Sequence, residues 1–143
     1  MDAEALLRNV PLFRGLDSKH LGRLAKACHE RSFPAGEVIV QEGQEGIGLF
    51  IIGSGRVEVV QLRSGGEQQL RTMGSGEVFG EIGLLADHPR TATVRATEPA
   101  TCMVLTVWSF KDAVDESPEI AKHLLKTVAQ WLVEVEDRVS ARL

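Results

Sequence analysis

The chain has 143 residues, of which 43% are hydrophobic and 25% charged, so it is long enough for one domain with an ordinary core. Its formal net charge of −4 excludes a general attraction to nucleic acid or to acidic membranes. No run reaches the ~20 apolar residues of a membrane span, and the acidic start, MDAEALLRNV, is not a signal peptide. We therefore expect a cytoplasmic protein in which Cys28 and Cys102 are buried thiols rather than a disulfide.

The first 34 residues have the patterns of helices, and the next segment, 35–107, has the pattern of a β-domain. A short helix is expected at 3–9, and a second helix follows an N-cap at Asp17 or Ser18. Short β-branched or apolar runs then alternate with glycine turns, at 38–40, 49–52, 57–60, 70–73, 91–96 and 101–107. Short strands at near-even spacing predict a jelly roll or small barrel. One insertion at 80–86 is more typical of a short helix.

The last segment, 108–143, is helical. A short helix is expected at 108–114, and Ser117 and Pro118 supply an N-cap and a first-turn proline for a longer one. Apolar residues then repeat at spacings of 3, 4, 3 and 4, namely Leu125, Val128, Leu132, Val135 and Val139. This pattern predicts a coiled-coil seam that forms a homodimer. Because the seam is short, a helix that packs only on its own core is the alternative.

The segment FGEIGLLADHPRTATVRA combines groups that attract an anion with one that repels it. A helix starting near Gly80 offers free backbone N–H groups, and a glycine lets a ligand approach them closely. Arg90 adds a guanidinium that can contact two oxygens of one phosphate, and Thr91 adds a hydroxyl. Glu81, when ionised, only accepts hydrogen bonds, so it needs a donor such as a ribose 2′-hydroxyl. A ribose with a phosphate folded back over it is a cyclic nucleotide.

FGEIGLL followed by PRTATVRA resembles the phosphate-binding cassette of the cyclic nucleotide-binding domain family. That family includes the bacterial catabolite activator, regulatory domains of protein kinases A and G, and cyclic nucleotide-gated channels. The similarity also includes VPLFRGL, IIGSGRVEV and VLTVWSF, and so covers almost the whole chain. The fold implied is mainly β with flanking helices: an eight-stranded, jelly-roll-like β-roll with the cassette at 79–96. A long C-terminal helix would close over the base.

The resemblance also implies roles for single residues. Gly80 and Ile82 would supply backbone N–H groups, Glu81 would hold the 2′-hydroxyl, and Arg90 would bind the cyclic phosphate beside Thr91. Leu70, at the start of an expected strand, is a further candidate ligand contact. The simpler alternatives are that Arg90 and Glu81 form a surface ion pair, that Glu81 is an ordinary first-turn acid, and that Thr91 is an ordinary strand residue.

Two positions on the long helix bear on the choice of base, because one hydrogen bond can decide between purines. The resemblance places Val135 and Glu136 where the catabolite activator has two polar contacts to adenine. Val135 cannot make that contact, whereas Glu136 can accept hydrogen bonds from guanine N1 and N2. In this family a threonine beside the cassette arginine often accompanies cGMP. We therefore favour cGMP over cAMP, with an exposed, uninvolved Glu136 as the alternative.

No catalytic or metal site is expected, because the four histidines are scattered and no HxH, GxSxG or Walker A motif occurs. We predict a single regulatory domain, 1–143, that is not an enzyme and needs no cofactor or metal. It would bind a cyclic nucleotide and signal through its C-terminal helices to an effector outside the chain. The alternatives are a non-binding dimerisation scaffold and the sensor half of a transcription regulator responding to cAMP. Nucleic-acid contact by this segment is not expected, since it has no basic recognition helix.

Overall fold

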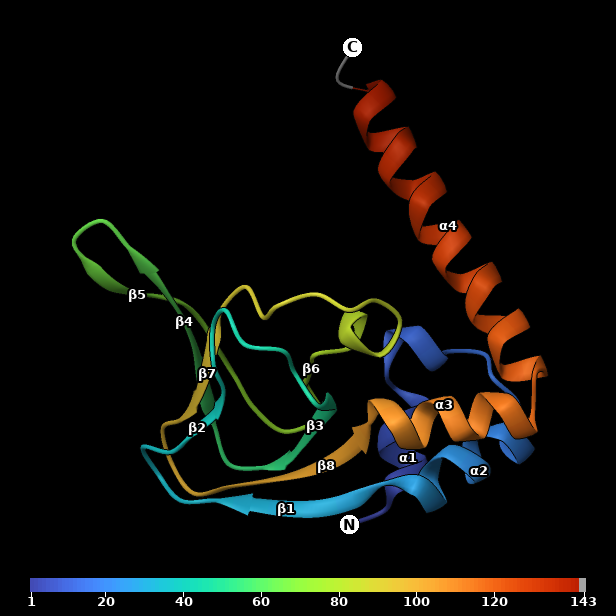
Figure 1. The fold of residues 1–143 in the computed structure, drawn as a ribbon, viewed down its shortest axis with the longest axis horizontal. Helices are drawn as coiled ribbons and strands as arrows, with labels where there is room; N and C mark the ends of the chain where they lie inside the picture. Colours follow the sequence, from blue (N-terminus) through green and yellow to red (C-terminus); the bar gives the residue numbers. More distant parts are fainter. Residues whose placement is uncertain (142–143) are drawn as a thin grey trace.

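The computed structural model, which describes residues 1–141, is a β-roll made of two antiparallel four-stranded sheets. One sheet has the order β1 (His29–Phe33), β8 (Ala100–Thr106), β3 (Gly48–Ser54), β6 (Val78–Phe79). The other has the order β2 (Val38–Val40), β7 (Thr93–Ala96), β4 (Val57–Arg63), β5 (Gly66–Met73). The predicted fold class, mainly β with flanking helices, is confirmed (Figure 1).

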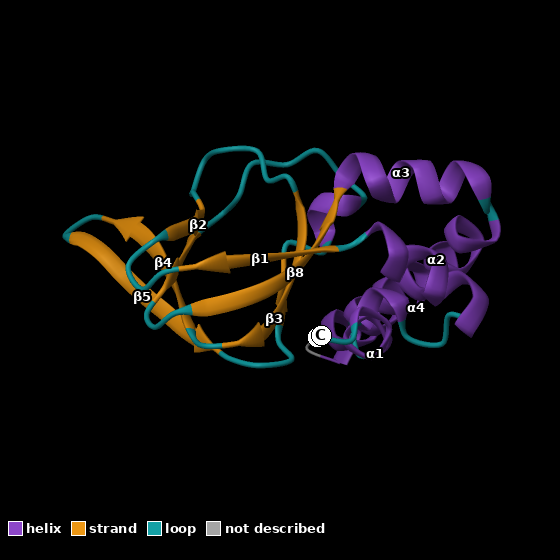
Figure 2. Cartoon of the chain, turned by 90° about the horizontal axis from the view of Figure 1, so that it is seen from below, coloured by secondary structure: helices purple, strands orange, loops and turns teal. Residues whose placement is uncertain are grey.

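The helices gather at one end of the roll, beside the sheet that contains β3 and β8 (Figure 2). They are α1 (Ala3–Arg8), η1 (Pro11–Phe13), α2 (Ser18–Ala27), η2 (Ile82–Leu84), α3 (Val107–Glu116) and α4 (Glu119–Ala141). Asp17 caps α2 as expected, because its carboxylate accepts a hydrogen bond from the backbone N–H of His20 at 2.9 Å. Within the described residues, no helix combines the length and apolar character that crossing a bilayer requires.

Strand β3 separates two hydrophobic cores. Leu49 and Ile51 pack in the core shared with the helices, whereas Phe50 and Ile52 pack in the core inside the roll. Successive residues of a strand point to opposite faces, so the unbroken apolar run LFII reflects a strand buried on both sides. Inside the roll, Phe50 stacks on Phe79 with ring centroids 5.0 Å apart.

Helix α4 leaves the body of the protein after its first turns (Figure 1). Its buried residues are Ile120 and Leu124, near its start. All members of the predicted seam are exposed: Leu125 by 71%, Val128 by 38%, Leu132 by 59%, Val135 by 46% and Val139 by 54%. The helix therefore carries an apolar face that its own domain does not cover, and the homodimer remains a prediction.

The structure differs from expectation in three elements. Strand β1 lies inside the first 34 residues, which the sequence groups with the N-terminal helices. Its first four residues are exposed and show no apolar alternation, so only the pairing with β8 defines it. Strand β6 has two residues, too few for a pattern, and the helix expected at 80–86 is only the single turn η2.

Both cysteines are free thiols, as predicted, and burial raises the pKa of each to about 11. Cys102 is fully buried inside the roll, whereas Cys28 is half-buried and its Sγ donates to the Leu24 carbonyl oxygen at 3.4 Å. The two thiols therefore differ in whether a polar replacement would find a hydrogen-bond partner.

Replacing Cys102 by serine should lower the free energy of unfolding by about 1–3 kcal/mol, because it buries a hydroxyl in an apolar core. The matched variant Cys28→Ser keeps an acceptor in the Leu24 carbonyl oxygen and should cost less. Urea unfolding of both variants measures the difference. Equal losses would show that the interior of the roll is more polar than described.

Candidate ligand-binding site

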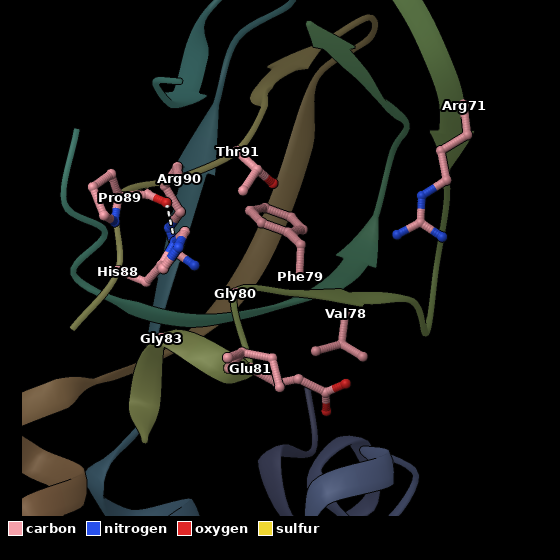
Figure 3. Close-up of a pocket in the computed structure, with 11 residues that line it drawn as sticks. Arg71, Val78, Phe79, Gly80, Glu81, Gly83, His88, Pro89, Arg90 and Thr91 are labelled. Atoms are coloured by element: carbon pink, nitrogen blue, oxygen red, sulfur yellow. Dashed lines mark hydrogen bonds between the residues drawn. The ribbon is translucent and has the colours of Figure 1, made fainter. Parts of the chain in front are cut away.

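A cavity of about 470 Å³ opens beside η2, within the size range of small-molecule sites. An adjoining cavity of about 150 Å³ shares five of its lining residues and adds apolar ones from β2, β4 and β7. The larger cavity is lined by Arg71, Val78, Phe79, Gly80, Glu81, Ile82, Gly83, His88, Pro89, Arg90 and Thr91 (Figure 3). Five of the eight predicted ligand residues are therefore brought together here.

Arg90 is held in place at its backbone and at its guanidinium. Its backbone N–H donates to the Gln44 carbonyl oxygen at 2.9 Å, and its own carbonyl accepts from the Gly43 N–H at 2.8 Å. Its Nη2 donates to the Gly48 carbonyl oxygen at 2.6 Å. Burial lowers the pKa of Arg90, but a guanidinium stays protonated in proteins. The site thus contains a fixed, partly buried positive charge.

Three glycines leave the space that the guanidinium occupies. A Cβ on Gly46 would overlap the guanidinium, and a Cβ on Gly83 would lie 3.1 Å from it. At Gly80 the φ angle is +85°, which favours glycine, and a Cβ would lie 2.8 Å from the guanidinium. The sequence analysis identified only Gly80, because the close approach of the other two to Arg90 depends on the fold.

Turn η2 presents backbone donors to the cavity. The N–H groups of Gly83 and Leu84 donate to carbonyl oxygens within the turn. Neither Glu81 nor Ile82 donates a backbone hydrogen bond in the part of the chain that the structure describes. These are the first N–H groups of a helical turn, which lack an internal partner and can bind an anion. The Ile82 N–H is thus a donor without a backbone partner among the described residues, and its contact with a ligand remains a prediction.

The Glu81 side chain points away from Arg90 and passes below Val78 (Figure 3). No ion pair joins Glu81 to Arg90 among the described residues, so the surface ion pair considered above is not formed. Burial raises the pKa of the Glu81 carboxyl, and a hydrogen bond from the backbone of Leu12 opposes that rise. The carboxylate is thus partly removed from water without a cation beside it.

Two buried side-chain atoms lack a hydrogen-bond partner among residues 1–141: Oε2 of Glu81 and Nε of Arg90. Such atoms are rare in folded proteins, because each costs about 1–3 kcal/mol when left unpaired. One is an acceptor when ionised and the other is a donor. A ligand that carries both a hydroxyl and an anionic group has the two kinds of partner that these atoms lack.

Arg71 is a charged lining residue, far from the cassette in sequence, that sequence reasoning missed. It lies on β5, and its guanidinium faces the cavity from the side opposite Arg90 (Figure 3). The pairing of β4 with β5 shifts between Val59↔Arg71 and Val60↔Gln69, which leaves Leu70 as an unpaired bulge residue. The predicted contact Leu70 is 43% exposed and does not line the cavity. A bulge can re-aim side chains in this way, but nothing in the sequence marks it.

The structure does not bring Val135 and Glu136 to the cavity. Both are exposed and lie in the part of α4 that projects away from the roll (Figure 1). The reason is that α4 packs on the core through Ile120, Leu124 and, halfway along, Trp131, whereas every residue from Leu132 to Ala141 is exposed and none of these residues lines the cavity. Among residues 1–141, no group of three or more His, Cys, Asp or Glu side chains could hold a metal ion.

Comparisons with known proteins found a family model and close relatives. The model described as "Cyclic nucleotide-binding domain" matches residues 30–117. The human protein named cGMP-dependent protein kinase 2 is 32% identical over 139 residues, covering 95% of this chain and 18% of the kinase. The chain spans between 18% and 34% of the length of the first curated relatives it matches.

The solved structures that share the fold include two at 30% identity or above. The N-terminal domain of a transcriptional regulator from Streptomyces coelicolor A3(2) has a TM-score of 0.87 at 30% identity, covering 94% of both chains. The regulatory domain of Toxoplasma gondii PKA, crystallised with cAMP, has a TM-score of 0.74 at 32% identity. That match covers 81% of this chain and 44% of the other.

Replacing Glu81 by glutamine should stabilise the protein at pH 7. Because burial raises the pKa of Glu81, the folded state favours the protonated carboxyl. The stability that this preference gives is lost as pH rises through the folded-state pKa. Glutamine removes the charge, and a neutral amide costs less to leave unpaired. The gain should shrink as pH falls through the folded-state pKa of Glu81, which burial raises above the usual value for a glutamate, because the wild-type carboxyl then takes up its proton.

Urea unfolding at several pH values measures this effect, with Glu45→Gln, in an exposed loop, as the control for lost charge. A Glu81→Gln variant that is less stable than wild type at pH 7 would show that the interaction of the carboxylate with the Leu12 backbone outweighs the cost of its burial.

Proposed function

Because the chain belongs to the cyclic nucleotide-binding domain family, we propose that it is a regulatory domain that binds a cyclic purine mononucleotide in the cavity beside η2. The observation that carries the proposal is the pair of unpaired buried atoms, Oε2 of Glu81 and Nε of Arg90. A cyclic nucleotide supplies a 2′-hydroxyl to the first and a phosphate to the second. The free N–H groups of Glu81 and Ile82 would share the phosphate.

The choice of cGMP over cAMP is part of the proposal and depends on two lining residues. The Thr91 side chain points into the cavity (Figure 3), and its hydroxyl would accept a hydrogen bond from a base amino group placed beside it. The Arg71 guanidinium can donate to O6 and N7 of guanine, the pairing by which arginine reads this base in nucleic acids. Adenine presents a donor in place of O6. Glu136 adds support only in a state in which α4 has moved toward the roll.

Helix α4 is the proposed output of the domain. A groove of about 400 Å³ links the cassette to the foot of α4, since it is lined by Leu84 and Leu85 on one side and by Leu124, Leu125 and Val128 on the other. A ligand that shifts η2 would change this groove and the seam that continues from it. The ligand can shift the equilibrium between two positions of η2 and α4 only by as much as its affinities for the two positions differ. We propose a cytoplasmic homodimer whose effector lies outside the chain.

A second candidate is the sensor part of a transcription regulator that responds to cAMP. The observation that favours it is the mutual 94% coverage with the N-terminal domain of the Streptomyces coelicolor regulator. The exposed seam on α4 would also fit a scaffold that dimerises without ligand. Nucleotide binding separates this last possibility from the other two.

Replacing Arg90 by alanine should weaken nucleotide binding by about 2–5 kcal/mol, because a desolvated phosphate loses its charge partner. Calorimetric titration of cGMP and cAMP measures the loss. The matched control is Arg31→Ala, which removes an exposed arginine on β1 that does not line the cavity. This variant should bind like wild type. An Arg90→Ala affinity within threefold of wild type would contradict the placement of the phosphate.

Replacing Arg71 by alanine should weaken cGMP binding about tenfold more than cAMP binding, since one bidentate contact to guanine gives ~1–3 kcal/mol of discrimination. The neighbouring variant Leu70→Ala, which alters a side chain outside the cavity, should leave the ratio of the two affinities unchanged. Titration of both nucleotides into each variant gives the ratios. Equal weakening of cGMP and cAMP by Arg71→Ala would remove the basis for the cGMP preference.

A further inference from the structure

We propose that Gln61 is a positioning residue of the ligand site, which holds the backbone at Thr91 so that the Thr91 hydroxyl faces the cavity. This inference rests on the proposed function, because it concerns the same cavity. Gln61 does not line the cavity itself. Its Nε2 donates to the carbonyl oxygen of Thr91 at 2.8 Å. Any effect of Gln61 on the ligand therefore acts through Thr91.

The strand register explains why a side chain is needed at this point. Strand β7 stops pairing with β4 at Thr93↔Val60, so the backbone of Thr91 lies beyond the end of the ladder. Along β4, Val57 and Val59 face the interior of the roll, and Gln61 follows them on the same face. The Gln61 amide thus supplies the hydrogen bond that the ladder would have given the Thr91 carbonyl.

Arg63 fixes the orientation of the Gln61 amide. Its Nε and Nη2 both donate to Oε1 of Gln61, at 2.9 and 2.7 Å. Because the amide oxygen is engaged by two donors, the amide nitrogen is the group that faces the Thr91 carbonyl. Arg63, Gln61 and Thr91 therefore form one directed chain of hydrogen bonds from the β4–β5 hairpin to the cassette.

The cassette segment around Arg90 is held from two sides by different means. On one side, backbone hydrogen bonds join Arg90 to Gly43 and Gln44, and no side-chain substitution removes them. On the other side, the Gln61 side chain holds Thr91. Gln61 is thus a part of this support that a substitution can remove without altering a residue that lines the cavity.

The test uses Gln61→Glu, which keeps the oxygen that accepts from Arg63 and removes the N–H that donates to Thr91. The control is Gln68→Glu, because Gln68 lies directly opposite Gln61 on β5 and places the same charge on the same face of the hairpin. We expect Gln61→Glu to bind cGMP about threefold to tenfold more weakly than Gln68→Glu, the range of one hydrogen bond. Melting temperatures confirm that both variants are folded.

A double-mutant cycle separates positioning from a general structural effect. In a Thr91→Ala background the hydroxyl is absent, so Gln61→Glu should change the affinity less than twofold relative to Gln68→Glu in the same background. Equal affinities of Gln61→Glu and Gln68→Glu in the wild-type background would overturn the inference while leaving the proposed function intact. A full effect that persists without the hydroxyl would also overturn it. A wild-type protein that binds neither cGMP nor cAMP would instead refute the proposed function.

Discussion

The guanidinium of Arg90 is the constraint on which the rest of the site depends, because a permanent charge is held partly out of water with one donor unused. Removing a charge from water is costly unless a partner replaces the lost hydration. The Gly48 carbonyl oxygen gives part of that replacement, and Gly46, Gly80 and Gly83 leave the space for the group. Arg90 itself lines the cavity, so an anionic ligand bound there would give the guanidinium the charge partner that the folded chain does not supply.

The cassette lies at the junction of the two cores. Phe79 belongs to the core inside the roll, whereas Leu84, five residues later, belongs to the core shared with the helices. Gly80, Glu81 and Ile82 connect the two, and the backbone of Leu12 in η1 opposes the rise in the pKa of the Glu81 carboxyl. A ligand bound at these residues would therefore act on both cores, which supports the proposal that binding changes the position of α4.

The sequence predicted the parts of the site that lie within one segment and missed those that depend on pairing between strands. Gly80, Glu81, Arg90 and Thr91 could be found because their chemistry is local. Arg71 could not, because it reaches the cavity only through the β4–β5 register and its bulge at Leu70. Strand β1 has no apolar alternation, and the position of Glu136 depends on a helix with few anchoring contacts. The fold class was predictable because it depends on a pattern repeated along the chain, namely short apolar runs separated by glycine turns.

The most direct test of this account is a calorimetric titration of the wild-type protein with cGMP and with its 2′-deoxy analogue. The account predicts that cGMP binds and that the analogue binds at least tenfold more weakly, because Oε2 of Glu81 again lacks a donor. Equal affinities for the two compounds would contradict the role given to Glu81. Binding of neither would contradict the claim that these two unpaired atoms mark a nucleotide site.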